Sequence, residues 1–308
     1  MRSVLSYILP WATWYLFKGC FASPEALKAQ IDKEKLKEKK LVTPSYEPSS
    51  RIQKKANFQQ RVIGGHPVYE VTSKSGRTPK SRVLFIHGGA FIFEITPLHW
   101  RFVIELADHL DAVVTVPIYP LGPDHSLLDM YDMLRPLYQQ MAESWEETPF
   151  IAIGDSAGGH LSLGLTQEAV DEGRKTAARL VLITPSVDTT FSNPDVVEKA
   201  KDDPWMDVPG CREIKRIICP DLSGDDPRAS PIHGVLDGLP PLQVFAAEKD
   251  LLTPDTMKFV DLVKQRGAEA ELIVGDAMLH CWPLMPMDEG RKAREQIFQF
   301  VGKSMTVE

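Results

Sequence analysis

The sequence has few cysteines and places none of them in a recognisable metal site. Four cysteines occur in 308 residues, with no C-x-x-C pair and no spacing typical of zinc ligands. This pattern argues against a disulfide framework and against a metal centre. We expect reduced thiols in a cytoplasmic protein that needs neither a metal nor an organic cofactor. The four thiols are Cys20, Cys211, Cys219 and Cys281.

A surplus of positive charge is also missing. The formal net charge is -7 and the pI is about 5.7. Proteins that bind nucleic acid meet its phosphates with clustered Lys and Arg, so no nucleic-acid partner is expected. The basic run Lys33 to Lys40 includes Glu34 and Glu38. That alternation is typical of a solvated helix face.

No apolar run is long enough to cross a bilayer as a standard helix. The longest candidate, Val4 to Phe17, has fourteen residues and contains Pro10. It follows Arg2 as in a short signal sequence, but Lys18 interrupts the small-residue region that cleavage after Ala22 would need. Secretion, a peripheral lipid contact through residues 1–20 and a helix over an apolar pocket are the alternatives to a plain cytoplasmic protein.

Strand-like and helix-like patterns alternate from about residue 67, with no repeat or low-complexity tract. This alternation predicts an α/β fold with a mostly parallel central sheet flanked by helices. The expected strands are Pro67–Thr72, Arg82–His87, Ala112–Pro117, Pro149–Ile153, Arg179–Thr184, Leu242–Ala247 and Ala270–Val274. The expected helices lie near 99–110, 126–144, 157–172, 254–266 and 288–302.

Two stretches fall outside this alternation. Residues 1–55 and the Asp/Pro-rich residues 187–228 break the pattern, and we expect them to form an N-terminal cap segment and a second cap insertion. The core is then residues 56–186 and 229–308. Together the two stretches predict a helical lid over one sheet edge.

The pentapeptide Gly154-Asp-Ser156-Ala-Gly158 joins an apolar strand to a helical pattern. A G-x-S-x-G turn in this setting raises the serine hydroxyl on a strained elbow, where glycine tolerates the crowding on either side. Ser156 is therefore the candidate nucleophile.

A serine nucleophile needs a base, and on this architecture the chain order is Ser, acid, His. Only His160, His233 and His280 follow Ser156. His160 lies one turn along the serine's own helix and His233 follows no strand. His280 lies in a loop, Gly275 to His280, just after an expected strand, so it is the candidate base.

The orienting carboxylate is expected in the exit loop of the strand Leu242 to Ala247. Asp250 is preferred there, with Glu248 as an alternative. Asp255 competes less well, because Thr253-Pro254-Asp255 is typical of a helix start with Thr253 as N-cap.

Attack on a carbonyl builds an oxyanion, which needs preorganised N–H donors. The run His87-Gly88-Gly89-Ala90 follows an expected strand, and glycines there let the backbone approach the substrate. The Ala157 N–H at the helix start offers a further donor.

These motifs resemble the hormone-sensitive lipase family of α/β-hydrolases over about residues 65 to 303. The resemblance implies an α/β-hydrolase fold with Ser156, Asp250 and His280 as catalytic residues and Gly88, Gly89 and Ala157 as oxyanion donors. It also implies a cap like that of the family's microbial esterases. The matching segments are His87-Gly-Gly-Ala-Phe91, Gly154-Asp-Ser-Ala-Gly-Gly159, Lys249-Asp250-Leu-Leu, Met278-Leu-His280, Ser230-Pro231, Leu239-Pro-Pro241 and Asp203-Pro-Trp205.

The chain departs from the family at two places near the expected pocket entrance. Relatives often carry Tyr-Arg-Leu-Ala-Pro-Glu where this chain has Tyr119-Pro-Leu-Gly-Pro-Asp124, and a glycine where it has Glu94. Neither position belongs to the expected triad.

These expectations favour a serine carboxylesterase that acts on small-molecule esters of short to medium acyl chains. A lactone hydrolase, an amidase or a deacetylase would use the same residues. A non-catalytic receptor is a further alternative, because a plant hormone receptor shares this fold; its catalytic histidine is replaced, whereas this chain keeps His280. A homodimer is left open.

Aromatic residues near the oxyanion loop predict a greasy acyl pocket, although aromatics are more often plain core. The candidate pocket residues are Phe91, Phe93, Trp100 and Asp155, with Trp11, Trp14, Tyr15 and Phe17 of the N-terminal segment. For Cys281, next to the base, plain packing is favoured over a redox role.

Overall fold

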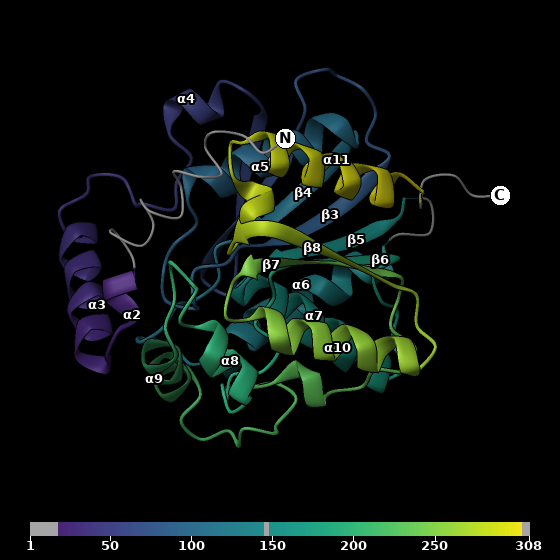
Figure 1. The fold of residues 1–308 in the computed structure, drawn as a ribbon. Helices are drawn as coiled ribbons and strands as arrows, with labels where there is room; N and C mark the ends of the chain where they lie inside the picture. Colours follow the sequence, from purple (N-terminus) through teal and green to yellow (C-terminus); the bar gives the residue numbers. More distant parts are fainter. Residues whose placement is uncertain (1–17, 145–147, 304–308) are drawn as a thin grey trace.

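The computed structural model describes residues 18–144 and 148–303, and the strands within them form one eight-stranded sheet (Figure 1). The strand order is β1-β2-β4-β3-β5-β6-β7-β8. The β1–β2 and β2–β4 pairs are antiparallel and the other five pairs are parallel. The bounds are β1 (Asn57–Ile63), β2 (His66–Thr72), β3 (Ser81–Ile86), β4 (Ala112–Pro117), β5 (Phe150–Asp155), β6 (Arg179–Ile183), β7 (Leu242–Lys249) and β8 (Ala270–Leu279).

The seven expected strands are all present, so the mostly parallel sheet is confirmed. Strand β1 was not expected. Its sequence, NFQQRVI, is exposed at five of seven positions and carries no apolar face, so it lacks the alternation that marks a half-buried strand.

Alternate residues of each central strand enter different cores. In β3, Val83 and Phe85 join the core beneath α5 and α11, whereas Leu84 and Ile86 join the core beneath α6, α7 and α10. The sheet is therefore covered on both faces (Figure 1). The covering helices are α5 (Pro97–His109), α6 (Leu127–Glu143), α7 (Ala157–Asp171), α10 (Thr253–Gln265) and α11 (Asp288–Gly302).

Helices α2, α3 and α9 gather beyond the carboxyl ends of the parallel strands (Figure 1). Helix α9 of the 187–228 segment contacts both α2 and α3 of the N-terminal segment. The contact is close because Gly210 of α9 faces the Phe21 backbone, where a Cβ would collide. The bounds are α2 (Gly19–Phe21), α3 (Pro24–Glu38), α4 (Ser50–Gln53), α8 (Pro194–Lys199), α9 (Val208–Ile218), η2 (Pro231–His233) and η3 (Trp282–Leu284).

Two local expectations need correction. The segment Gly275 to Leu279 is not a loop but the end of β8, whose register against β7 shifts between Ala247 and Lys249. Thr253 does not cap α10: it is the first helical residue, and its hydroxyl donates to Ala247 O at 2.6 Å.

The apolar N-terminal run and its aromatic residues lie outside the described residues. Along 18–144 and 148–303, no helix has both the length and the apolar character that crossing a membrane requires.

Candidate active site

Ser156 lies between the end of β5 and the start of α7, in a backbone conformation that favours glycine. Its φ is 53° and its ψ is -117°. The Ser156 N–H donates to Ile183 O at 2.8 Å, which ties the turn to β6. Gly158 allows the turn to close, because a Cβ there would collide with the carbonyl groups of Ile86 and His87. The expected elbow is thus present, with only 8% of Ser156 exposed.

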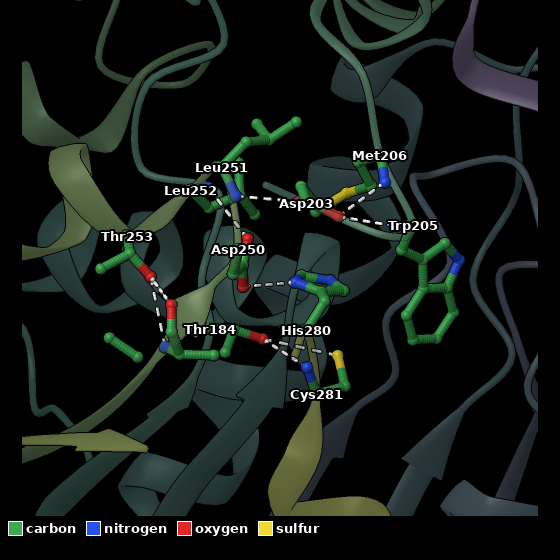
Figure 2. A network of polar contacts seen from close by, with 12 residues as sticks. Thr184, Asp203, Trp205, Met206, Asp250, Leu251, Leu252, Thr253, His280 and Cys281 are labelled. Atoms are coloured by element: carbon green, nitrogen blue, oxygen red, sulfur yellow. Dashed lines mark hydrogen bonds and ion pairs between the residues drawn. The ribbon is translucent and has the colours of Figure 1, made fainter. Parts of the chain in front are cut away.

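Asp250 and His280 form a buried pair beyond the ends of β7 and β8 (Figure 2). His280 Nδ1 lies 2.8 Å from Asp250 Oδ2, and Asp250 Oδ1 accepts the Leu252 N–H at 2.9 Å. An ionised carboxylate only accepts, so the proton of this contact belongs to Nδ1. That leaves Nε2 as the imidazole nitrogen free to accept a proton.

The environment of the pair favours the imidazolium. Burial lowers the pKa of His280, but the adjoining Cys281 and the Asp250 carboxylate raise it, and the net direction is well above the usual value. Burial also raises the pKa of the Cys281 thiol, so the thiol is uncharged at neutral pH. The negative charge beside His280 is therefore that of Asp250.

The chain neighbours of Ser156 and His280 touch each other. The Cys281 thiol donates to Asp155 Oδ2 at 3.5 Å, and the Cys281 N–H donates to Thr184 Oγ1 at 3.2 Å. Asp155 immediately precedes Ser156 and Cys281 immediately follows His280. The predicted serine, acid and histidine are therefore gathered at one edge of the sheet.

The glycine-rich turn after β3 faces this elbow, and one of its N–H groups is already engaged. The Gly88 N–H donates to Asp155 Oδ1 at 3.0 Å. Gly89 follows with φ 125°, a conformation that only glycine adopts readily. Of the three predicted donors, Gly88 is thus tied to the elbow, and Gly89 and Ala157 remain predicted donors.

Two side chains that the sequence did not suggest brace this turn. His99 Nε2 lies 3.2 Å from Asp155 Oδ2. The Tyr119 hydroxyl donates to His87 O at 2.7 Å, and its ring stacks on the His87 imidazole with centroids 4.6 Å apart. Tyr119 is the first residue of the segment that departs from the family pattern, and that departure was the one sequence feature that pointed to it. Burial lowers the pKa of His87 to about 4, so its ring is neutral.

A small apolar cavity of about 40 Å³ opens beside Ser156. The N-terminal segment supplies Phe21, and the glycine-rich turn after β3 supplies Phe91, which was expected to line the pocket. The rest of the lining is Ala90, Ser156, Ala157, Ser186, Thr189, Phe191, Met206, Cys211, Ile214, Lys215, Ile218 and Leu252.

Three residues expected in the pocket do not line this cavity. Trp100 is in the core on the α5 face, 1% exposed, with its ring edge-on to Tyr69 and its N–H donated to Tyr46 O. Phe93 packs against the core of the opposite face. Asp155 is buried and engaged with Gly88. The prediction was wrong for these residues because residue type does not distinguish core from cavity.

The competing site residues have other partners. The two ring nitrogens of His160 each lie 2.8 Å from a backbone carbonyl oxygen, those of Ser186 and Arg228, and His233 is exposed. Glu248 accepts the Ala277 N–H, and Asp255 accepts from the Asn193 amide. None of these contacts involves His280.

Among the described residues, no cluster of three or more His, Cys, Asp or Glu side chains could hold a metal ion. The four cysteines are free thiols, as expected.

Several known proteins are similar in sequence to this chain. A model of the alpha/beta hydrolase fold family matches residues 83–284. An esterase of Acinetobacter venetianus is 29% identical over 185 residues, which cover 59% of this chain and 61% of that protein. A triacylglycerol lipase of Mycobacterium tuberculosis is 29% identical over 205 residues, which cover 66% of this chain and 42% of that protein. The chain thus matches less than two thirds of the length of either relative.

Solved structures match over nearly the whole chain. A Staphylococcus aureus protein assigned as an esterase has a TM-score of 0.82 at 25% identity, covering 97% of this chain and 98% of its own. An esterase from the bacterial hormone-sensitive lipase family has a TM-score of 0.74 at 21% identity, covering 90% and 99%.

Proposed function

The chain belongs to the α/β-hydrolase fold family, and from this membership we propose that it is a serine carboxylesterase acting on small-molecule esters. The observation that carries the proposal is the buried contact of 2.8 Å between His280 and Asp250, at the same sheet edge as Ser156. An esterase and a triacylglycerol lipase among the similar proteins support the same chemistry.

In the acylation step, Ser156 Oγ attacks the ester carbonyl carbon while its proton moves to His280 Nε2. The Gly89 and Ala157 N–H groups stabilise the oxyanion. His280 then gives the proton to the departing alkoxide, so the alcohol leaves and the acyl group stays on Ser156.

In the deacylation step, water gives a proton to His280 and attacks the acyl carbon. Collapse of this second intermediate breaks the bond to Ser156, which recovers the proton, and the carboxylic acid leaves. Asp250 holds the imidazole in one tautomer through both steps.

The cavity beside Ser156 favours short acyl groups. Its volume is only about 40 Å³ and its lining includes Phe21, Phe91 and Phe191, which supports a preference for short to medium acyl chains over long ones. We also propose that residues 1–55 and 187–228 act as the cap, because Phe21 of the first and Ile214 of the second line this cavity.

The proposal is tested by replacing the nucleophile. Ser156→Ala should lower kcat/KM for p-nitrophenyl butyrate by at least about 10³-fold and abolish labelling by a fluorophosphonate probe, which needs an activated serine. The matched control is Ser162→Ala on the same helix, which should keep both activities. Near-normal turnover by Ser156→Ala would contradict the proposal, and a wild type that labels but cleaves only lactones or amides would redirect it.

A further inference from the structure

A loop of the 187–228 segment reaches the Asp250–His280 pair from outside the sheet (Figure 2). Asp203, 1% exposed, accepts the Leu251 N–H on Oδ2 at 2.9 Å. Its Oδ1 accepts the N–H groups of Trp205 and Met206 at 2.7 and 2.9 Å. One buried carboxylate thus joins its own turn to the residue that follows Asp250.

The same loop contacts the imidazole. The Trp205 ring stands at 89° to the His280 ring, with centroids 5.7 Å apart. An edge-to-face contact of this kind restricts ring rotation. Met206, one residue on, lines the cavity beside Ser156. Within four residues, the loop contacts the acid's backbone, the base's ring and the substrate cavity.

Lys18 fastens this loop to the N-terminal segment. Its ammonium donates to Ala200 O at 2.6 Å, Asp203 O at 2.9 Å and Met206 O at 2.8 Å. The Asp207 carboxylate lies 3.7 Å away. These carbonyl groups accept no hydrogen bond from a helix or strand, so the loop is held in its conformation by the Lys18 ammonium instead.

We propose that residues 203–206 are a positioning loop for the catalytic pair, in which Asp203 fixes the backbone after Asp250, Trp205 confines the His280 ring and Lys18 holds the loop in place. The proposal rests on the function proposed above and extends it, since it assigns three positioning residues outside the triad. Through the loop, the two cap segments take part in aligning the base.

A change in the pKa of His280 would distinguish a positioning role from simple loss of packing. Burial and the facing Asp250 carboxylate raise the pKa of Asp203 to about 6, so Asp203 is mostly ionised above neutral pH. Two other titratable groups lie near it: the Cys211 thiol, on whose pKa Asp203 acts, and the Lys18 ammonium, which donates to Asp203 O. Asp203 faces Asp250, the carboxylate that stabilises the imidazolium, and we expect the loss of its negative charge to lower the pKa of His280.

The test is Asp203→Asn, followed by NMR of isotope-labelled histidine. Asn keeps one acceptor oxygen and turns an NH2 group toward the other donor, so it cannot accept both from Leu251 and from the Trp205 and Met206 N–H groups. The downfield Nδ1–H signal of His280 should therefore move or broaden. The pKa of His280 should fall by about half a unit or more. In turnover of p-nitrophenyl butyrate, kcat should fall about tenfold with KM nearly unchanged.

The control is Asp255→Asn, another buried acid bonded to the 187–228 segment but through Asn193, which should leave the His280 signals unchanged. A folded Asp203→Asn protein with wild-type Nδ1–H signal and pKa would overturn the proposal, as would a rate loss equal at every pH with no change in those signals. The NMR readout does not need turnover, so an inactive wild type would defeat the proposed function while the positioning role is still decided.

If the Asp203→Asn protein does not fold, variants of Trp205 test the proposal instead, because the Trp205 ring is only half-buried. Trp205→Leu should broaden the His280 ring signals and lower kcat about tenfold, and Trp205→Phe should restore most of both. Lys18→Met should give a smaller loss of the same kind, whereas Lys35→Met, which removes the exposed pair with Asp124, should give none. Wild-type behaviour of Trp205→Leu would overturn the proposal.

Discussion

The protonation state of His280 decides when Ser156 can lose its proton. The pKa of His280 lies above its usual value of about 6.5 because Asp250 stabilises the imidazolium. The base works only when deprotonated, so kcat/KM should rise with pH and reach half its plateau above pH 6.5. Initial rates with p-nitrophenyl butyrate from pH 5 to 9.5 measure this. A flat profile, or an inflection below 6.5, would contradict the assignment.

Gly88 is a position where one added methyl group should disturb the active site. A Cβ there would lie against the Asp155 carboxylate and 3.0 Å from Ser156 Cβ. Gly88→Ala should therefore displace the oxyanion turn and lower kcat about 10² to 10³-fold, the cost of losing one oxyanion donor. Single-turnover kinetics would measure it. Gly302→Ala, which meets no atom within 4 Å, is the control and should leave the rate unchanged.

Sequence reasoning located Ser156, Asp250 and His280 because each directly follows a parallel strand, and the strands themselves are apolar runs. It could not find Lys18 or His99, since their partners are distant carbonyls or a buried carboxylate. No local pattern encodes such contacts. Trp100 shows the opposite error: an aromatic side chain near a site by sequence was assigned to the pocket, although it packs on another face.

Helix α9 contributes Cys211, Ile214, Lys215 and Ile218 to the lining of the cavity beside Ser156, so shortening its side chains should change acyl selectivity. Ile214→Ala should raise the kcat/KM ratio of hexanoate to acetate nitrophenyl esters several-fold, because the cavity gains the volume of the lost methylene groups. Ile31→Ala removes a side chain of equal size in α3 that lies outside the cavity lining. It should destabilise the protein without changing the ratio; equal ratios in both variants would exclude α9 from substrate selection.

Element boundaries were predictable only where side chains alternate cleanly. Strand β1 has no apolar face, and the end of β8 carries Gly275 and Asp276, which are typical of a turn. In the folded chain β8 continues through an irregular register against β7, with Ala277 at φ 53°. Pairing with a neighbouring strand therefore overrides the local preference, and that pairing cannot be seen in one segment.

Stability of the whole molecule should fall in mild acid because of a buried histidine. Burial lowers the pKa of His160 to about 4 in the folded chain, against about 6.5 unfolded. Between these values the unfolded chain binds the extra proton, so the free energy of unfolding decreases as pH falls. Urea denaturation at several pH values from 6 to 4.5 should show His160→Gln with a slope smaller by about 1.2 kcal/mol per pH unit.

The control for that slope is His109→Gln, whose ring is exposed on α5. It should match the wild type across the same range. A His160→Gln slope equal to that of the wild type would mean that the buried ring is charged in the folded protein.

At the scale of the whole chain, the alternation of strands and helices sufficed to predict a mostly parallel sheet covered by helices, and the motif resemblance implied the α/β-hydrolase fold; both are confirmed. The strand order was not predictable, because apolar runs do not say which neighbour they pair with. The contact of α2 and α3 with α9 was equally hidden. It joins segments that are almost 200 residues apart.

The Lys18 contacts can form only late in the synthesis of the chain. Its carbonyl partners follow it by 182 to 188 residues, which a ribosome needs roughly 10 to 40 s to add at about 5 to 20 residues per second. During that interval α3 has emerged while α9, against which it packs, does not yet exist. Leu27 and Ile31, which are buried in the folded chain, therefore lack the cover of α9 until residues 208–218 have been made.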